Sequence, residues 1–194
     1  MPVPRARVTE RRARRSGSSA DGVLYPLDVF YARAGIGGPT VKPVTPDRIP
    51  QPYHDLLVHE NEMTATLERH FGGPLAVRVL SSFSKDRSYF RRVLLALEST
   101  GRPVAMGAVR LRLERFKPAV RARILAERTP LGRIFREAGV LYESRPTAFV
   151  QLTPNAEMLG LFWMAGPRTI YGRRTEVTTG GAGIGDIVEI IPLV

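Results

Sequence analysis

The stretch Ser88-Tyr-Phe-Arg-Arg-Val-Leu-Leu-Ala-Leu97 has the composition of a β-strand, because branched and aromatic residues dominate it and turn residues lie on both sides. Side chains alternate between the two faces of a strand, so Arg91 shares one face with Tyr89 and Val93, while Arg92 points to the other. Both faces are otherwise mostly apolar. The strand therefore places an arginine among apolar side chains whichever face is buried.

An arginine in such surroundings needs an anion, and no acidic residue lies in this strand. Leaving the guanidinium unpaired would cost several kcal/mol, so at least one of Arg91 and Arg92 should meet a carboxylate or reach solvent. Two interpretations follow. The arginine has a structural role, in an ion pair or at a sheet edge where it reaches solvent, or it binds the carboxylate of a ligand. The alternation of side chains does not choose between the two arginines.

The chain has 194 residues, of which 43% are hydrophobic, which is enough for one domain with a full core. Its formal net charge of +11 suits nucleic acid, anionic lipid or a small anionic metabolite, and arginines in the first 20 residues carry much of the excess. It has no cysteine and no apolar run near the roughly 20 residues that span a bilayer. We expect a cytoplasmic protein without a membrane span.

Composition divides the chain into three parts. Residues 1–22 are predicted to be a disordered basic tail, residues 23–55 an irregular arm rich in proline and glycine, and residues 56–194 a compact domain. The periodicity of apolar residues predicts helices near 60–71, 118–125, 131–138 and 155–162. Strands are predicted near 75–81, 89–98, 104–113, 148–152, 169–178 and 184–191. Strands interrupted by helices without regular βαβ alternation indicate an α+β fold with a mainly antiparallel sheet and helices on one face.

The segment Thr129-Pro-Leu-Gly-Arg133 precedes the third predicted helix. Thr129 can cap that helix and Pro130 suits its first position, which leaves the amides of Leu131 and Gly132 free for a carboxylate or phosphate. The alternative is an ordinary capped helix without a ligand.

Glu189 is the second informative polar residue, since it lies between Ile187 and Ile191 on one face of the last predicted strand. If that face is buried and no cation is close, burial raises the pKa of Glu189, as is usual for a catalytic or hydroxyl-binding carboxylate. The alternative is an exposed glutamate on an edge strand.

Other motifs favour structural roles. The run Gly180-Gly-Ala-Gly-Ile-Gly185 is interpreted as a hairpin turn, because too few residues follow it for a dinucleotide-binding unit. Side chains alternate along a strand, so Arg173 and Arg174 point to opposite faces. We expect one of them to be an ion-pair partner and the other to be solvated. The remaining candidates are histidines without metal-ligand spacing, expected on the surface, and large apolar residues, expected in the core: His54, His59 and His70, and Met63, Phe162 and Trp163.

Five short motifs follow one another along the chain: Glu60-Asn-Glu-Met-Thr64, Tyr89-Phe-Arg-Arg-Val-Leu-Leu95, Thr129-Pro-Leu-Gly-Arg133, Tyr171-Gly-Arg-Arg-Thr175 and Val188-Glu189. In their order and spacing they resemble the chorismate lyase (chorismate–pyruvate lyase) family, over about Leu56 to Ile191. The resemblance implies a UTRA-like fold with a six-stranded antiparallel sheet, and a site without metal or organic cofactor.

Carried over residue by residue, the resemblance implies that Arg91 and the backbone amide of Leu131 bind the ring carboxylate of the substrate. Glu189 would then meet the ring hydroxyl, and Met63 would belong to a flap over the pocket. The chain departs from the family at Arg92, where the family often has an acidic residue, and in the arm before the domain, which has no counterpart.

The implied function is a cofactor-independent carbon–oxygen lyase that converts chorismate to 4-hydroxybenzoate and pyruvate, with Glu189 and Arg91 as catalytic residues. The alternative is a non-catalytic effector-binding domain of the same architecture, as found in some transcription regulators. Against it, no helix-turn-helix pattern precedes the domain, so any DNA-reading unit would be a separate chain. A third possibility is nucleic-acid binding through the arginine-rich tail, although no specific nucleic-acid partner is expected. The sequence predicts neither an oligomeric state nor the pathway that uses the product.

Overall fold

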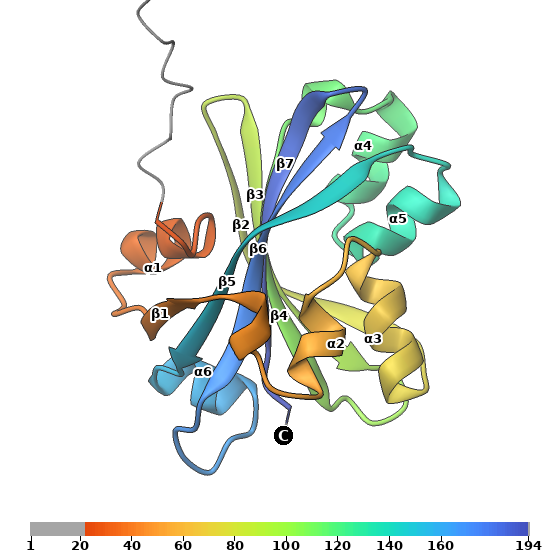
Figure 1. The fold of residues 1–194 in the computed structure, drawn as a ribbon. Coiled ribbons are helices and arrows are strands. Elements are labelled where there is room, and N and C mark those ends of the chain that lie inside the picture. The colour runs from red at the N-terminus through yellow and green to blue at the C-terminus, as the bar shows by residue number, and fades with distance from the viewer. Residues whose placement is uncertain (1–21, 194) are drawn as a thin grey trace, which may run out of the picture.

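A computed structural model describes residues 22–193 of the chain (Figure 1). Its strands are β1 (Thr40–Val44), β2 (Leu75–Lys85), β3 (Ser88–Leu97), β4 (Pro103–Leu111), β5 (Glu143–Thr153), β6 (Ile170–Thr179) and β7 (Ala182–Ile191). Within the described residues these form one seven-stranded sheet in the order β1-β5-β6-β7-β4-β3-β2, and every pairing is antiparallel. The predicted α+β class is confirmed. The basic tail predicted for residues 1–22 lies, apart from Gly22, outside the described residues.

The helices are α1 (Leu27–Ala34), α2 (Tyr53–Leu57), α3 (Met63–Phe71), α4 (Pro118–Leu125), α5 (Leu131–Glu137) and α6 (Ala156–Leu161), with short 3-10 turns at Pro46–Arg48 and Leu113–Arg115. Local chemistry sets several ends: the Glu62 side chain accepts from the Ala65 N–H at the start of α3, and Gly72 ends it with φ 72°. In the part of the chain that the structure describes, no helix has the length and apolar character needed to cross a membrane.

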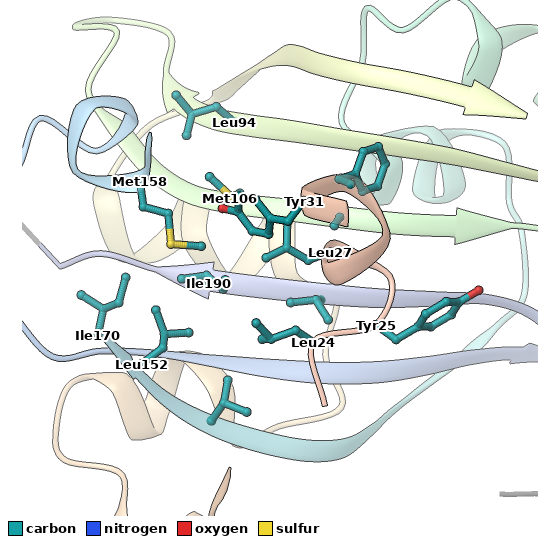
Figure 2. Packing of buried hydrophobic residues seen from close by; sticks show 14 of the residues in the cluster. Leu24, Tyr25, Leu27, Tyr31, Leu94, Met106, Leu152, Met158, Ile170 and Ile190 are labelled. Atoms are coloured by element: carbon teal, nitrogen blue, oxygen red, sulfur yellow. The ribbon is translucent and has the colours of Figure 1, made fainter. Parts of the chain in front are cut away.

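Helices cover both faces of the sheet, so the expectation of helices on one face is wrong. In Figure 1, α2, α3, α4 and α5 lie on one side of the sheet and α1 on the other. Leu27 and Tyr31 of α1 pack with Met158 of α6 in one buried cluster against the sheet, as Figure 2 shows. The reason is that the central strands are apolar on both faces, and each face needs a cover.

The segment 23–55 is not an irregular arm, because it contains α1, β1 and the start of α2. Leu27, Phe30 and Tyr31 follow helical spacing and are buried against the sheet. Strand β1 pairs with β5, which makes the sheet seven-stranded and not six-stranded. The proline and glycine residues of this segment lie mostly outside these short elements, and they obscured the helical pattern. The domain boundary at residue 55 stays a prediction.

Two further expectations are settled by the fold. The glycine run at 180–185 does form a hairpin turn between β6 and β7, where Gly180 and Gly181 have φ values of 53° and 75°. Phe162 is buried as expected, but Trp163 is 65% exposed and has φ 57°, so its assignment to the core is wrong.

Candidate functional site

A cavity of about 80 Å³ lies on the face of the sheet that α3 and α5 cover. This is several times the roughly 10–15 Å³ that one buried water needs. The sheet forms the floor of the cavity, and Gly107 of β4 leaves a depression in it because it has no side chain. In the sheet, Gly107 pairs with Val93 of β3 on one side and with Glu189 of β7 on the other. A Cβ atom at Gly107 would lie 3.3 Å from Cγ2 of Val93, so the missing side chain leaves part of this space open.

Most of the cavity wall is apolar, with a few polar side chains converging on it. The apolar lining comes mainly from the central strands and α5: Val77, Val93, Leu95, Ala105, Val109, Leu131, Phe135, Val177 and Ile187. The polar and charged lining comes from Glu62, Thr64, Arg91, Tyr142, Ser144, Arg173 and Glu189. This combination is typical of a small-molecule site, where apolar walls exclude water and a few polar groups fix the orientation of the ligand.

Arg91 is 1% exposed and forms no ion pair with any carboxylate of the described residues. Its Nη1 donates to the Ile124 carbonyl oxygen at 3.4 Å, and its Nε has no hydrogen-bond partner in that part of the chain. Burial lowers the pKa of Arg91, and the charge interactions with Tyr89 and Glu127 only partly oppose this. The cavity therefore has a buried positive charge at one side without a matching anion.

Arg92 has the opposite surroundings and answers the question that the sequence left open. It points to the other face, where Nη1 and Nη2 donate to the two carboxylate oxygens of Glu157 at 2.7 and 2.9 Å. Its guanidinium also lies 5.5 Å from the ring centroid of Tyr31. Arg92 thus forms a structural ion pair, and Arg91 faces the cavity.

Glu189 lies on β7, an interior strand, so it is not an exposed edge residue. Its side chain is 13% exposed, and its Oε2 accepts from Nε of Arg173 at 2.7 Å. Arg173 is the ion-pair partner that alternation left undecided. Arg174 pairs with Asp186 at 3.4 Å on the opposite face, so the expectation that one of the two arginines is solvated is wrong.

Arg91 and Glu189 face the same cavity from different strands. Arg91 pairs with Val109 of β4, which in turn pairs with Ile187 of β7, two residues before Glu189. Two strand spacings separate β3 from β7, a distance of roughly 10 Å between their backbones. The floor between the two charged residues is the apolar face of β4. An unpaired cation and a carboxylate thus lie on opposite sides of one water-excluding space.

The helix start at α5 differs in detail from its prediction. The first helical residue is Leu131, Pro130 is the N-cap, and no side chain caps the helix, so Thr129 does not have the predicted role. Leu131 lines the cavity. Because the first amides of a helix have no intrahelical acceptor, the Leu131 N–H in the first position is not used by the helix itself.

Met63 lies at the first position of α3 and is both a core residue and part of the cavity wall. It is buried in a cluster with Leu67 and Leu75. Its role as a flap residue stays a prediction. All four residues proposed from the sequence, Arg91, Leu131, Met63 and Glu189, line this one cavity.

Glu62 is a cavity residue that the sequence did not indicate. It connects α3 to α5, because one carboxylate oxygen forms an ion pair with Arg136 and the other caps Ala65 at 3.2 Å. A Cβ atom on Gly132 would fall 1.9 Å from Oε1 of Glu62, so this approach requires glycine at that position. The two helices therefore meet directly at the cavity wall.

Tyr142 and Ser144 were also missed, because the strand was predicted to begin at residue 148, whereas β5 begins at Glu143. Their spacing of two residues is the signal that could have found them. The ring of Tyr142 lies 5.1 Å from that of Phe135. Burial, together with the negative charges of Glu62 and Glu189, raises the pKa of Tyr142 to about 12. The phenol is therefore neutral at physiological pH and can donate a hydrogen bond.

Glu127 is a carboxylate that interacts electrostatically with Arg91, and it already accepts a hydrogen bond from another residue. Tyr89 donates to Oε1 of Glu127. Burial disfavours the charge of Glu127, but hydrogen bonds with Ser82 and Tyr89 and the positive charge of Arg91 outweigh it and lower the pKa of Glu127. Glu127 thus influences Arg91 at a distance without neutralising it.

Comparison with known proteins shows the fold and not the family. No protein-family model and no curated protein matches the chain. PhnF from Mycobacterium smegmatis is similar in structure with a TM-score of 0.50 at 14% identity, over 70% of this chain and 65% of that one. The ligand-binding domain of a putative GntR-family transcriptional regulator from Bordetella bronchiseptica gives a TM-score of 0.46 at 14% identity, over 61% of this chain and 86% of that domain. The likeness to PhnF agrees with the UTRA-like fold and says nothing of lyase activity.

Proposed function

We propose that the cavity binds a small cyclic carboxylic acid, that this acid is chorismate, and that the protein is a chorismate pyruvate-lyase. The observation that carries the proposal is Arg91, a fully buried cation that lines the cavity and has no carboxylate partner in the described chain. A ligand carboxylate would supply the missing charge through a charge-assisted hydrogen bond.

In this proposal Arg91 and the Leu131 N–H bind the ring carboxylate of chorismate. Glu189 accepts a hydrogen bond from the ring hydroxyl on the other side of the cavity. The bond between the ring and the ether oxygen breaks, the neighbouring ring carbon loses its proton, and the ring becomes aromatic as 4-hydroxybenzoate. The released enolpyruvate takes up a proton on its methylene carbon and becomes pyruvate.

Because aromatisation drives this elimination, the protein chiefly has to hold the substrate in a reactive conformation and exclude water. The apolar floor and walls suit that task. Arg91 and the helix-start amide offer fixed electrostatic partners that need little reorganisation during the reaction. No nucleophile takes part in this scheme.

The decisive experiment incubates the purified chain with chorismate and follows 4-hydroxybenzoate and pyruvate by chromatography. Formation of both products in equal amounts, above the rate of a buffer blank, supports the lyase. Chorismate that stays intact at a protein concentration where it is shown to bind would rule the lyase out.

A non-catalytic effector-binding domain is the second candidate. A feature of the site favours it, since Glu189 is held in an ion pair with Arg173 and is not a free base. This candidate predicts that calorimetry detects binding of 4-hydroxybenzoate or a related ring acid, and that Arg91→Met abolishes it, while chorismate is not consumed.

A further inference from the structure

Arg173 makes contacts in two directions from the cavity. Its Nε donates to Oε2 of Glu189 at 2.7 Å, on the neighbouring strand β7. Its Nη1 donates to the carbonyl oxygens of Leu57 and His59 at 3.1 and 2.8 Å. Leu57 ends α2, and His59 lies in the segment 58–62 between α2 and α3, called here the α2–α3 loop. One buried guanidinium therefore connects a cavity carboxylate to the backbone of this loop.

The contact with Nε determines how Glu189 is presented to the cavity. Oε2 is engaged by Arg173, and Oε1 has no hydrogen-bond partner among the described residues. A ligand hydroxyl would therefore meet Oε1, in an orientation that the planar guanidinium fixes. Since Arg173 is 1% exposed, its own position is determined by packing and by these contacts.

The contact with Nη1 holds the loop that leads into the cavity wall. The α2–α3 loop ends at Glu62 and is followed by Met63, and both of these residues line the cavity. Nδ1 of His59 also lies 3.3 Å from Nη1 of Arg173. The position of the loop and the orientation of Glu189 thus depend on the same side chain.

We propose that Arg173 is a positioning residue, which couples the position of the α2–α3 loop to the orientation of Glu189 toward the ligand hydroxyl. The inference rests on the proposed function, because it assigns a task to a residue of that site. Lysine cannot replace arginine in this role: its single ammonium group cannot donate to a carboxylate on one side and to two carbonyls on the other in fixed directions.

The first test is kinetic and uses Arg173→Lys, which keeps the positive charge and loses the fork of donors. We expect kcat for chorismate to fall by about 100-fold, with a smaller change in KM, because the misplaced carboxylate acts in the reaction more than in binding. Arg92→Lys is the matched control, since it disturbs another largely buried arginine–glutamate pair on the opposite face of the same sheet. Equal losses of kcat in both variants would indicate a general structural effect and overturn the assignment.

The second test does not need turnover and measures amide hydrogen exchange of the peptide covering residues 57–63. Exchange should be faster in Arg173→Lys than in the wild type, and unchanged in Arg92→Lys. It should also be faster in Glu189→Gln, because an amide holds the guanidinium less strongly than a carboxylate does.

Glu189→Gln keeps the inference testable if Arg173→Lys does not fold. If the loop exchanges at the wild-type rate in both Arg173→Lys and Glu189→Gln, or in whichever of them folds, the coupling is overturned. If the wild-type chain neither binds nor converts chorismate, the proposed function fails, while faster loop exchange in the same variants would still show the coupling. The two failures are therefore distinguishable.

Discussion

Arg91 and Arg92 are adjacent in β3 and have equally apolar sequence neighbours, yet only Arg92 has a carboxylate partner among the described residues. Arg92 forms two hydrogen bonds with Glu157, whereas the Arg91 guanidinium is left with one long contact to the Ile124 carbonyl oxygen. Removing the positive charge of a buried ion pair lowers the stability of the folded protein, whereas removing a buried cation without a partner raises it. This difference separates an arginine with a structural ion pair from one whose charge is left available to a ligand.

Replacing each arginine by methionine should therefore change stability in opposite directions. Arg92→Met leaves Glu157 without its partner and should lower the free energy of unfolding by about 1–3 kcal/mol. Arg91→Met removes a buried charge that has no counter-ion, so the free energy of unfolding should rise by about 1 kcal/mol. The same substitution should lower chorismate turnover or binding at least about 100-fold. Urea denaturation of both variants measures the first effect. A loss of stability in Arg91→Met as large as that in Arg92→Met would contradict the unpaired state of Arg91.

Gly107 should control the size of the cavity. Gly107→Ala places a methyl group on the floor, 3.3 Å from Val93, and should weaken binding of 4-hydroxybenzoate by about tenfold, a cost of about 1.4 kcal/mol. Isothermal titration calorimetry gives the change. Gly183→Ala is the control, since this β7 glycine has no neighbour within 4 Å of an added Cβ atom. Equal affinity in the two variants would mean that the ligand does not use the space over Gly107.

Glu62 and Gly132 should be strongly coupled in stability. In the wild-type background, Gly132→Ala forces the Glu62 carboxylate away from its position and breaks its ion pair with Arg136, so the free energy of unfolding should fall by about 1–3 kcal/mol. In a Glu62→Ala background, the same substitution should be neutral or stabilising by up to about 1 kcal/mol, because alanine favours the helix over glycine. A double-mutant cycle measures the coupling, and additive effects would refute the direct contact.

His59 should make stability depend on pH in a defined window. Burial, together with the positive charge of Arg173, lowers the pKa of His59 in the folded state below its ordinary value of 6.5. The unfolded chain therefore binds a proton at a higher pH than the folded chain does. The contribution of His59 is complete above pH 6.5 and is lost as the pH falls toward the folded pKa. Denaturant unfolding between pH 8 and pH 5 should show a steeper loss for the wild type than for His59→Gln, and parallel curves would refute this.

Part of the site could be predicted from the period-two pattern of the strands, which singled out Glu189 and the adjacent pair Arg91 and Arg92. The same pattern could not say which face of a strand the core covers, and so it left Arg91 against Arg92 and Arg173 against Arg174 undecided. Burial of a face depends on helices from distant segments, which the sequence period does not report. Only the packed fold assigns each arginine to its side.

The parts that were missed share a physical reason. The residues from 23 to 55 were read through their proline and glycine content, although Leu27, Phe30 and Tyr31 have helical spacing. Tyr142 lies just before the first residue of β5, in a part of the chain with little strand propensity. Short elements at the periphery are stabilised by contacts with the sheet more than by their own propensity. The local sequence pattern therefore identified the central strands, but it missed the peripheral segments that pack over the two faces of the sheet.

The floor of the cavity belongs to the four central strands β3, β4, β7 and β6, whose residues are distant in sequence. A bound molecule would bridge chain segments that must all separate when the protein unfolds. Any true occupant should therefore raise the melting temperature of the whole domain, by an amount equivalent to about 2.7 kcal/mol when its concentration is 100 times its dissociation constant. A thermal-shift screen of ring acids against the wild type and Arg91→Met would consequently identify compounds that bind through Arg91 even if no reaction occurs.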